Sequence, residues 1–421
     1  MVTRVETLII GAGQAGLALS RHLTSLGSEH LVVDRGRVAE RWRTQRWDSF
    51  RLLTPNWQLR LPGHAYAGSD PDGFLTREQI VGFFDRYAES FDAPVRTGVT
   101  VHRVRPVNGA AQEWIVETSA ERFVAANVVV ATGYHDLPRI PLPCSRALSI
   151  DVAQYHTSDY RHPKQLPSGG VLVVGAGPSG QQIADELALA GRTVVIAVGR
   201  HRVLPRRYRG RDAHWWMEQM GAFDRTIDNL PDPQAVRSAP AFVLAGERRD
   251  LNLRRLAKHG VLPVGRMAGA LGSTVWFHDD LAANVAAADD NVRRFREAVD
   301  AFIARTGIDA AAPEAPLPSD APWALTAPRL LHLGHTGISA VIWATGHRRH
   351  YSWIDAPVFD AAGEPVQRRG VTDAPGLFFL GLRWMYRRSS DTIHGVGADA
   401  AHLAGLIARH PRSVESTLIG A

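Results

Sequence analysis

The sequence predicts an α/β fold made of two Rossmann-like dinucleotide-binding domains. Three observations lead to this fold class. The pattern GxGxxG occurs twice, each time directly after a short apolar run and directly before a helical pattern, and each of these units is followed by a second apolar run. A continuous apolar run is typical of a parallel strand that is covered on both faces. Glycines at the turn from such a strand into a helix are the fingerprint of a dinucleotide site.

The first unit begins at residue 5 with the segment "VETLIIGAGQAGLALSRHLTSLGSEHLVVDRG". We expect a strand over residues 7–10, a helix that ends near Gly27, and a second strand over residues 31–33 that ends at Asp34. A carboxylate at that strand end accepts hydrogen bonds from the two hydroxyls of a ribose and repels a 2′-phosphate. The first ligand is therefore predicted to be FAD or NAD. The phosphate loop and its flanks give these candidate contacts: Gly11, Gly13, Gln14, Ala15 and Gly16.

The second unit, "GGVLVVGAGPSGQQIADELALAGRTVVIAVGRHRVLPRRYRGRD", has a different strand end. Its strands are expected over residues 171–174 and 193–198, with a helix through Leu189 between them. Instead of an acid, this strand end has Gly199 and then Arg200, 20 residues after Gly180, and an Arg there can bind the 2′-phosphate of NADPH. Arg206 and the other arginines nearby leave open which one makes that contact. The candidate contacts of this unit are Gly175, Gly177, Pro178, Ser179, Gly180, Arg200 and Arg206.

The composition argues against several other classes of protein. The chain has 421 residues, a formal net charge of +6 and 45% hydrophobic residues, without an apolar run long enough for a membrane span. Of the 48 basic side chains only Lys164 and Lys258 are Lys, so the basic balance reflects Arg usage and does not predict nucleic-acid binding. We expect a cytoplasmic protein with no membrane or nucleic-acid partner and no metal site.

The single cysteine, Cys144, excludes an enzyme class that shares the two-dinucleotide plan. Disulfide reductases need a redox pair of cysteines beside the flavin, and one thiol cannot form a pair. Oxygen is then the natural electron acceptor. Reduction of a quinone or a ferredoxin leaves no mark in a sequence and stays an alternative.

Several motifs together resemble the flavin-containing monooxygenases. "GAGQAGLA" and "GAGPSGQQIA" flank "QYHTSDYR", in which His156, Tyr160 and Arg161 match the family's FxGxxxHxxxY linker motif with its basic residue. Ile150 and Val152 stand where that motif has Phe and Gly. The related Baeyer–Villiger enzymes have Trp-Pro at positions 160 and 161, so the match favours the N- and S-oxygenating branch.

The resemblance extends over nearly the whole chain. "NVVVATGYHDLPRIP" and "AVIWATGHRRH" resemble the segments at which such chains cross back beside the flavin and the nucleotide, and "GLFFLGLRWMYRRSSDTIHGVGADAAHLAGLIA" resembles the closing strand and helix of the FAD domain. "VAERWRTQRW" resembles the GGxW segment, with Ala39 and Glu40 in place of its glycines. The resemblance adds these FAD and nucleotide contacts: Arg35, Arg41, Trp42, Ala131, Thr132, Gly133, Thr345, Gly346 and Gly381.

The resemblance also implies a reaction. NADPH reduces FAD, the reduced FAD reacts with O2 to give a C4a-(hydro)peroxyflavin, and one oxygen atom passes to a small N-, S- or carbonyl-containing molecule. The protein contributes orientation and exclusion of water. His156, Tyr160 and Asn56 are the candidate catalytic residues, although His156 and Tyr160 are expected to order the domain junction rather than transfer protons. Trp384 and Tyr386 are candidates for a pocket over the flavin.

The expected domains are an FAD domain over residues 1–150 and 335–421 and an inserted NADPH domain over residues 151–334. Residues 95–130 predict a β-meander, residues 76–91 a helix capped by Thr76, residues 279–307 a long helix and residues 309–328 an irregular connection. "DAHWWMEQMGAFDR" fits either a substrate wall or a helix packed on the core. Two functions remain beside the monooxygenase: an NADPH oxidase or reductase, and a nucleotide-responsive binding protein. Substrate identity and oligomeric state, with a homodimer as one option, stay open.

Overall fold

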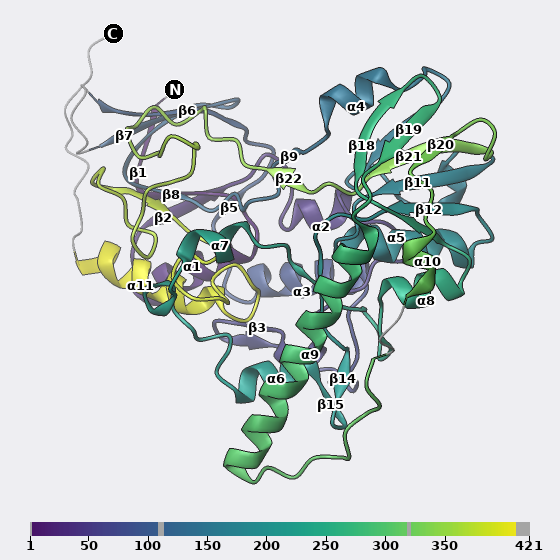
Figure 1. The fold of residues 1–421 in the computed structure, drawn as a ribbon. Coiled ribbons are helices and arrows are strands. Elements are labelled where there is room, and N and C mark those ends of the chain that lie inside the picture. Colours follow the sequence, from purple (N-terminus) through teal and green to yellow (C-terminus); the bar gives the residue numbers. More distant parts are fainter. Residues whose placement is uncertain (1, 108–112, 318–320, 410–421) are drawn as a thin grey trace.

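The computed structural model describes residues 2–107, 113–317 and 321–409, so the parts of the expected ranges that fall on the remaining residues lie outside the described residues. Two α/β units lie beside each other, each built around its own twisted sheet (Figure 1). The expected fold class is confirmed, because each sheet has parallel strands that lead into a GxGxxG turn.

The first sheet has the strand order β5-β2-β1-β8-β7-β6, and β23 also pairs with β8. β1, β2, β5 and β23 pair in parallel, whereas β6, β7 and β8 form the predicted antiparallel meander. β8 has two partners on the same edge, because its first half pairs with β7 and its last residues pair with β23. The bounds are β1 (Val2–Ile10), β2 (His30–Val33), β5 (Val95–Arg96), β6 (Val101–Pro106), β7 (Trp114–Thr118), β8 (Arg122–Val130) and β23 (Leu377–Phe379).

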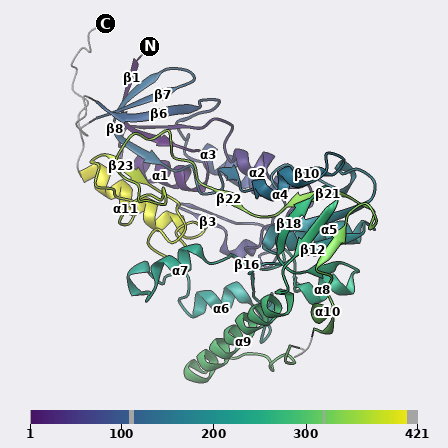
Figure 2. The same cartoon turned by 45° about the horizontal axis from the view of Figure 1, so that its top comes forward.

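The helices α1 and α3 of this unit begin where the sequence predicts them. α1 (Gln14–Ser25) follows the first glycine turn and lies beside α11 (Val396–Arg409), as both views show (Figures 1 and 2). α3 (Arg77–Glu89) begins at the predicted cap: the Thr76 hydroxyl accepts from the backbone N–H of Gln79, and the Gln79 side chain accepts from the backbone N–H of Thr76. This reciprocal capping box satisfies two backbone donors at the helix start.

The second sheet is entirely parallel, with the order β10-β21-β11-β12-β17. Its central strands are fully buried, as their continuous apolar sequence predicts. The helix α5 (Pro178–Leu189) follows the second glycine turn and ends at the predicted residue. The bounds are β10 (Ala153–His156), β11 (Gly170–Val174), β12 (Val194–Ala197), β17 (Leu262–Val264) and β21 (Ile338–Trp343).

The pairing of β21 shifts the boundary expected at residue 334. This strand follows that boundary in the sequence, yet it lies between β10 and β11 in the second sheet. The chain returns to the first sheet only at β23. Strand pairing moves the boundary because β21 has the apolar run needed for the centre of a sheet, and the second sheet provides that position.

Two short strands connect the units. β9 (Leu137–Pro138) follows β8, β22 (His347–Arg348) follows β21, and the two pair antiparallel between the sheets (Figure 1). Arg139 N–H also donates to Gly346 O at 2.9 Å. The segments that contain the two Ala-Thr-Gly sequences therefore lie side by side where the chain passes between the units.

The remaining elements are smaller or lie at the edges of the two units. α9 is the long helix predicted over residues 279–307, and α6 carries the Trp-rich segment. Their bounds are α2 (Glu40–Thr44), β3 (Arg60–Leu61), β4 (His64–Ala65), α4 (Leu142–Ala147), β13 (Arg202–Val203), β14 (Arg207–Tyr208), β15 (Arg211–Asp212), α6 (Ala213–Gln219), α7 (Pro233–Ser238), β16 (Phe242–Val243), α8 (Leu253–Lys258), β18 (Met267–Leu271), β19 (Thr274–Phe277), α9 (Leu281–Thr306), α10 (Pro322–Leu325) and β20 (Leu330–His332). Among the described residues, no helix is both long enough and apolar enough to cross a membrane.

Candidate functional site

The first glycine turn has the shape of a phosphate-binding loop. Gly11 has φ +115°, and a Cβ there would lie 2.6 Å from the carbonyl oxygen of Ala131, so only glycine fits. A Cβ on Gly16 would overlap the carbonyl oxygen of Gly11. Nothing lies within 4 Å of the position of a Cβ on Gly13. The loop therefore packs tightly against its own unit and stays open at Gly13, where a pyrophosphate would approach the backbone.

Asp34 lies at the end of β2 and is fixed against this loop. Its Oδ2 accepts from the N–H of Ala12 at 2.8 Å, and its Oδ1 accepts from the N–H of Gly36 at 2.8 Å. Each carboxylate oxygen accepts more than one hydrogen bond, so both oxygens retain capacity for ribose hydroxyls. The carboxylate is thus oriented by the backbone before any ligand binds.

The segment after Asp34 joins the loop that follows β8. Arg41 donates to Asp136 Oδ1 at 2.7 Å and to the carbonyl oxygen of His135, and Arg35 donates to the same Asp136 oxygen at 3.2 Å. Trp42 packs against Phe84 with 6.4 Å between ring centroids. Arg35 and Arg41 therefore hold the 131–136 loop, and Trp42 anchors the segment to the core.

Ala39 occupies a position at which the GGxW segment has glycine, and its backbone conformation is one that favours glycine. Its N–H donates to the carbonyl oxygen of Ala12 in the phosphate loop at 3.1 Å. It does so with φ +56°, a left-handed conformation that glycine adopts at lower cost. The backbone contact of this segment with the phosphate loop persists although an alanine occupies the position.

The C-terminal segment closes over the start of α1. Gln14 Nε2 donates to the carbonyl oxygen of Asp391 at 2.7 Å, and a Cβ on Gly381 would lie 2.8 Å from the Cβ of Ala15. The Asp391 carboxyl contacts the Tyr134 hydroxyl, and burial raises the pKa of both groups. Gln14, Ala15 and Gly381 thus meet at one place, together with a Tyr–Asp pair that the motifs did not predict.

The second glycine turn repeats this geometry. Gly175 has φ +115° and lies against Ala344, as Gly11 lies against Ala131. A Cβ on Gly180 would overlap the carbonyl oxygen of Gly175, while nothing lies within 4 Å of a Cβ on Gly177. Gly177 caps α5 in an extended conformation, and Pro178 and Ser179 begin the helix. The second phosphate loop therefore has the same tight side and the same open side.

A cleft of about 800 Å³ lies at the carboxyl ends of the second sheet. Gly175, Gly199 and Thr345 line it, and so do three cations, Arg139, Arg200 and Arg266. Arg206 lies elsewhere: it is 1% exposed, pairs with Asp212 and donates to the carbonyl oxygens of Leu53 and Ala245. Arg200 is thus in a position to meet a phosphate in this cleft, whereas Arg206 is occupied by protein partners.

Three histidines meet where the two connections cross. The His347 ring lies 5.0 Å from that of His135 and 4.7 Å from that of His156. His156 Nδ1 accepts from the N–H of Ser158 at 3.2 Å, so Nε2 carries the proton and donates to the carbonyl oxygen of Gly346 at 2.9 Å. Burial lowers the pKa of all three, to about 3 for His347. The cluster is therefore neutral near pH 7.

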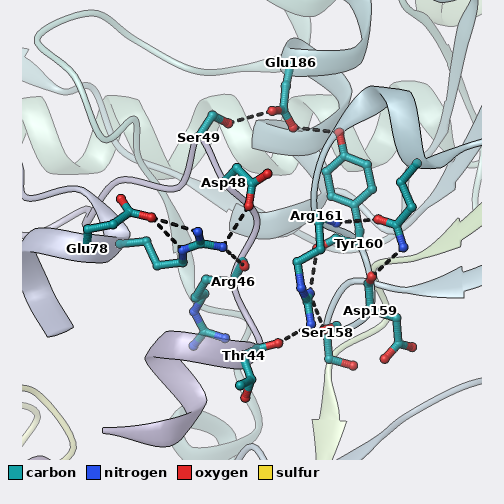
Figure 3. A network of polar contacts seen from close by, with 12 residues as sticks. Thr44, Arg46, Asp48, Ser49, Glu78, Ser158, Asp159, Tyr160, Arg161 and Glu186 are labelled. Atoms are coloured by element: carbon teal, nitrogen blue, oxygen red, sulfur yellow. Dashed lines mark hydrogen bonds and ion pairs between the residues drawn. The ribbon is translucent and has the colours of Figure 1, made fainter.

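Tyr160 and Arg161 tie the linker to both units (Figure 3). Tyr160 is fully buried and donates to Glu186 Oε2 on α5 at 2.7 Å, and Ser49 donates to Glu186 Oε1 at 2.7 Å. Arg161 donates to the carbonyl oxygen of Thr44 and accepts at its own carbonyl oxygen from the N–H of Asp48 at 2.8 Å. The linker is thus a structural joint between the units.

Asn56, Trp384 and Tyr386 have less direct connections to the nucleotide loops. Asn56 is buried at the start of a short 3-10 turn, where its Nδ2 donates to the carbonyl oxygen of Asp70 at 2.9 Å. Trp384 is buried with φ +51°, and the Tyr386 ring lies under the guanidinium of Arg369 at 4.5 Å. None of these contacts reaches Gly11–Gly16 or Gly175–Gly180.

Sequence reasoning overlooked His135 and His347. Each comes just after one of the two Ala-Thr-Gly segments, and that shared placement was the available signal. Among the described residues no group of acidic, His or Cys side chains could hold a metal ion. Cys144 is half-buried and lines the cleft near Arg139.

The chain is similar to known oxidoreductases over most of its length. The family model described as "Pyridine nucleotide-disulphide oxidoreductase" matches residues 8–212. A CzcO-like uncharacterized oxidoreductase of Geobacillus kaustophilus is 34% identical over 411 residues, which is 96% of this chain and 99% of that protein. An indole-3-pyruvate monooxygenase of rice, YUCCA1, is 30% identical over 203 residues, which is 47% of this chain and 49% of that protein.

Among solved structures, a flavin-containing monooxygenase of Stenotrophomonas maltophilia superposes with a TM-score of 0.65 at 18% identity, covering 97% of this chain and 99% of that one. These likenesses, with the two glycine turns, confirm the expected resemblance to flavin-containing monooxygenases. More narrowly, the chain belongs to the family of CzcO-like oxidoreductases.

Proposed function

We propose that the protein is an NADPH-dependent FAD monooxygenase that oxygenates a small N-, S- or carbonyl-containing molecule. One observation carries the proposal: two phosphate loops of the same geometry have opposite charges after the next strand, since Asp34 directly follows β2 and Arg200 comes three residues after β12. Asp34 is held by backbone N–H groups beside the first loop, and Arg200 lines the cleft beside the second. Two different dinucleotides fit this arrangement better than two copies of one.

The residues of the first unit fit FAD. The open space at Gly13 and the start of α1 would receive the pyrophosphate, and Asp34 would accept hydrogen bonds from the ribose. Gln14, Ala15 and Gly381 would line the place where the C-terminal segment meets the helix. When bound, FAD accepts a hydride and activates O2, which is the chemistry that amino-acid side chains do not supply.

The residues of the second unit fit NADPH. Gly177 is open to a pyrophosphate, and the cleft next to it has room for a nucleotide. Arg200, with Arg139 and Arg266 nearby, would bind the 2′-phosphate through charge-assisted hydrogen bonds. Arg206 has no part in this proposal, because Asp212 and two carbonyl oxygens already occupy its guanidinium.

The chain's own contribution would be orientation and exclusion of water. His156 holds the carbonyl oxygen of Gly346 beside the second Ala-Thr-Gly segment, and Tyr160 holds Glu186 on α5. Both side chains are buried and have protein partners, which supports a positioning role and not proton transfer. In this proposal the enzyme is cytoplasmic, uses O2 and has no nucleic-acid partner.

Rapid mixing of the NADPH-reduced protein with O2 tests the proposal. A monooxygenase should hold a flavin absorbance, distinct from those of reduced and oxidised flavin, for seconds and lose it faster with substrate. Prompt release of one H2O2 per NADPH with every substrate tried would support the oxidase alternative instead. A purified protein without yellow flavin, or one that NADPH does not bleach, would favour a nucleotide-responsive binding protein.

A further inference from the structure

A second cavity, of about 440 Å³, is separate from the cleft that Arg200 lines, which is called the nucleotide cleft below. Its volume is typical of pockets for small molecules. The wall combines a cationic part with an apolar part, formed by these six residues: Arg202, Arg294, Arg388, Met217, Phe242 and Phe295. They come from α6, α9, β13, β16 and the segment before α11, so this cavity forms only when the chain is folded.

Two of the three arginines lie close to the same aromatic ring, that of Phe242. The Arg202 guanidinium lies 3.7 Å from the centroid of the Phe242 ring, and the Arg388 guanidinium lies 5.3 Å from the same centroid. Arg202 also donates to Asn291 Oδ1 at 3.3 Å. Arg294, at the exposed rim, already pairs with Asp290 at 2.6 Å. In the described part of the chain, no carboxylate forms an ion pair with Arg202 or Arg388.

This arrangement of cations is electrostatically unfavourable without an anion. Burial, together with the nearby Arg202, Arg225 and Arg383, lowers the pKa of Arg388 to about 10, while Asp391 acts in the other direction. Burial and Arg383 likewise lower the pKa of Arg202. Arg202 and Arg388 are half-buried, and a cation partly removed from water is stabilised by an opposite charge or by several acceptors, which a ligand could supply.

The cavity adjoins both dinucleotide units. Arg202 comes two residues after Arg200, which lines the nucleotide cleft. Arg388 N–H donates to the carbonyl oxygen of Arg225 at 3.0 Å, and three residues later the carbonyl oxygen of Asp391 accepts from Gln14 at the start of α1. A molecule in this cavity would thus contact the segment that closes over the predicted flavin site.

We infer that this cavity binds the substrate as an organic carboxylate. Arg388 and Arg202 receive the carboxylate, and Met217, Phe242 and Phe295 receive an apolar or aromatic body. Guanidinium groups suit this task because their donors match the two oxygens of a carboxylate. The role as substrate rests on the proposed monooxygenase function, whereas the binding of an aromatic carboxylate does not.

Calorimetric titration with a matched pair of probes tests the inference. The probes are (4-methylsulfanylphenyl)acetate and its primary amide, which have nearly the same shape but differ in charge. The wild-type holoenzyme should bind the carboxylate about tenfold more tightly than the amide, or better. Arg388→Gln and, independently, Arg202→Gln should each remove this preference. Arg237→Gln, at an exposed residue of α7, is the charge-matched control and should keep it.

The outcomes separate the inference from the proposed function. Equal affinity of the wild-type protein for both probes, or an unchanged preference in Arg388→Gln and Arg202→Gln, would overturn the inference. Thermal unfolding shows whether a variant is folded, and Arg388→Gln should not lower the unfolding temperature because it relieves repulsion among cations. If the carboxylate binds as expected but is never oxygenated in the presence of NADPH and O2, the proposed function fails while the anion site stands.

Discussion

The two glycine turns share their backbone geometry and differ in the charge at the end of the next strand. In both, the first glycine has φ +115° and lies against an alanine that directly follows a neighbouring strand, Ala131 in one unit and Ala344 in the other. In both, the second glycine faces open space. The next strand, however, is followed directly by Asp34 in the first unit, whereas in the second unit Val198 and then Gly199-Arg200 follow it. The geometry of the turn is therefore duplicated, and we propose that the choice of nucleotide depends on the residues that follow the next strand.

The largest expected effect comes from breaking the shared geometry. Gly16→Ala and Gly180→Ala each place a Cβ on a carbonyl oxygen of their own turn, which should cost about 3 kcal/mol of unfolding free energy. Urea unfolding measures this. Gly13→Ala and Gly177→Ala are the matched controls, because their Cβ atoms meet open space: they should keep the stability and weaken only nucleotide binding. Loss of stability in the controls as well would contradict the equivalence of the two turns.

The next largest effect tests the difference in charge between the two strand ends. Arg200→Ala should raise the KM for NADPH about 10–100-fold, because a hydrogen bond to a charged group contributes about 1.5–3 kcal/mol. The KM for NADH should stay nearly constant, because NADH has no 2′-phosphate. Steady-state kinetics with both nucleotides measure this. Equal changes for NADH and NADPH would show that Arg200 does not read the phosphate.

A smaller effect is expected at the joint between the units. His156→Ala leaves the carbonyl oxygen of Gly346 without its donor, a loss of about 1 kcal/mol. We expect NADPH oxidation to continue with a larger share of H2O2 per turnover, because the joint no longer fixes the second crossing segment. Peroxide yield per NADPH measures this. Tyr160→Phe, which removes only the hydroxyl that holds Glu186, should act in the same direction. Unchanged H2O2 yields in both variants would show that the segment around His156 and Tyr160 is only a linker.

The last effect, which is absent near pH 7 and develops only as the pH falls, is a dependence of stability on pH. The folded protein lowers the pKa of His135, His156 and His347 below the value in the unfolded chain, so it binds fewer protons. Their contribution is fully present above about pH 6.5 and is lost as the pH falls toward the pKa of about 3 of His347. Each histidine contributes at most about 1.4 kcal/mol per pH unit. Unfolding temperatures between pH 7.5 and 5 should fall less steeply in His347→Phe, which keeps a ring but does not titrate.

Local pattern was enough to predict much of the fold. The strand–glycine–helix order located β1, α1, β11 and α5 within a few residues, because each depends on nearby turns and apolar periodicity. Strand pairing needed the tertiary structure: nothing local indicates that β21 lies between β10 and β11 and not in the first sheet. The role of Arg206 was also beyond local pattern, since its partners come from distant segments.

The sequence by itself determined the two dinucleotide turns and their opposite strand-end charges, because glycine geometry and the residue at a strand end are local properties. Only the tertiary structure decided which arginines stay available to a ligand. Arg200, Arg202 and Arg206 lie within seven consecutive residues, yet they have different surroundings. Arg200 lines the cleft at the second sheet, Arg202 lies at the Phe242 ring together with Arg388, and Arg206 is buried against Asp212. The physical reason is that desolvation and partner charges depend on the segments that pack around a side chain, and the chain brings those segments from far away in the sequence.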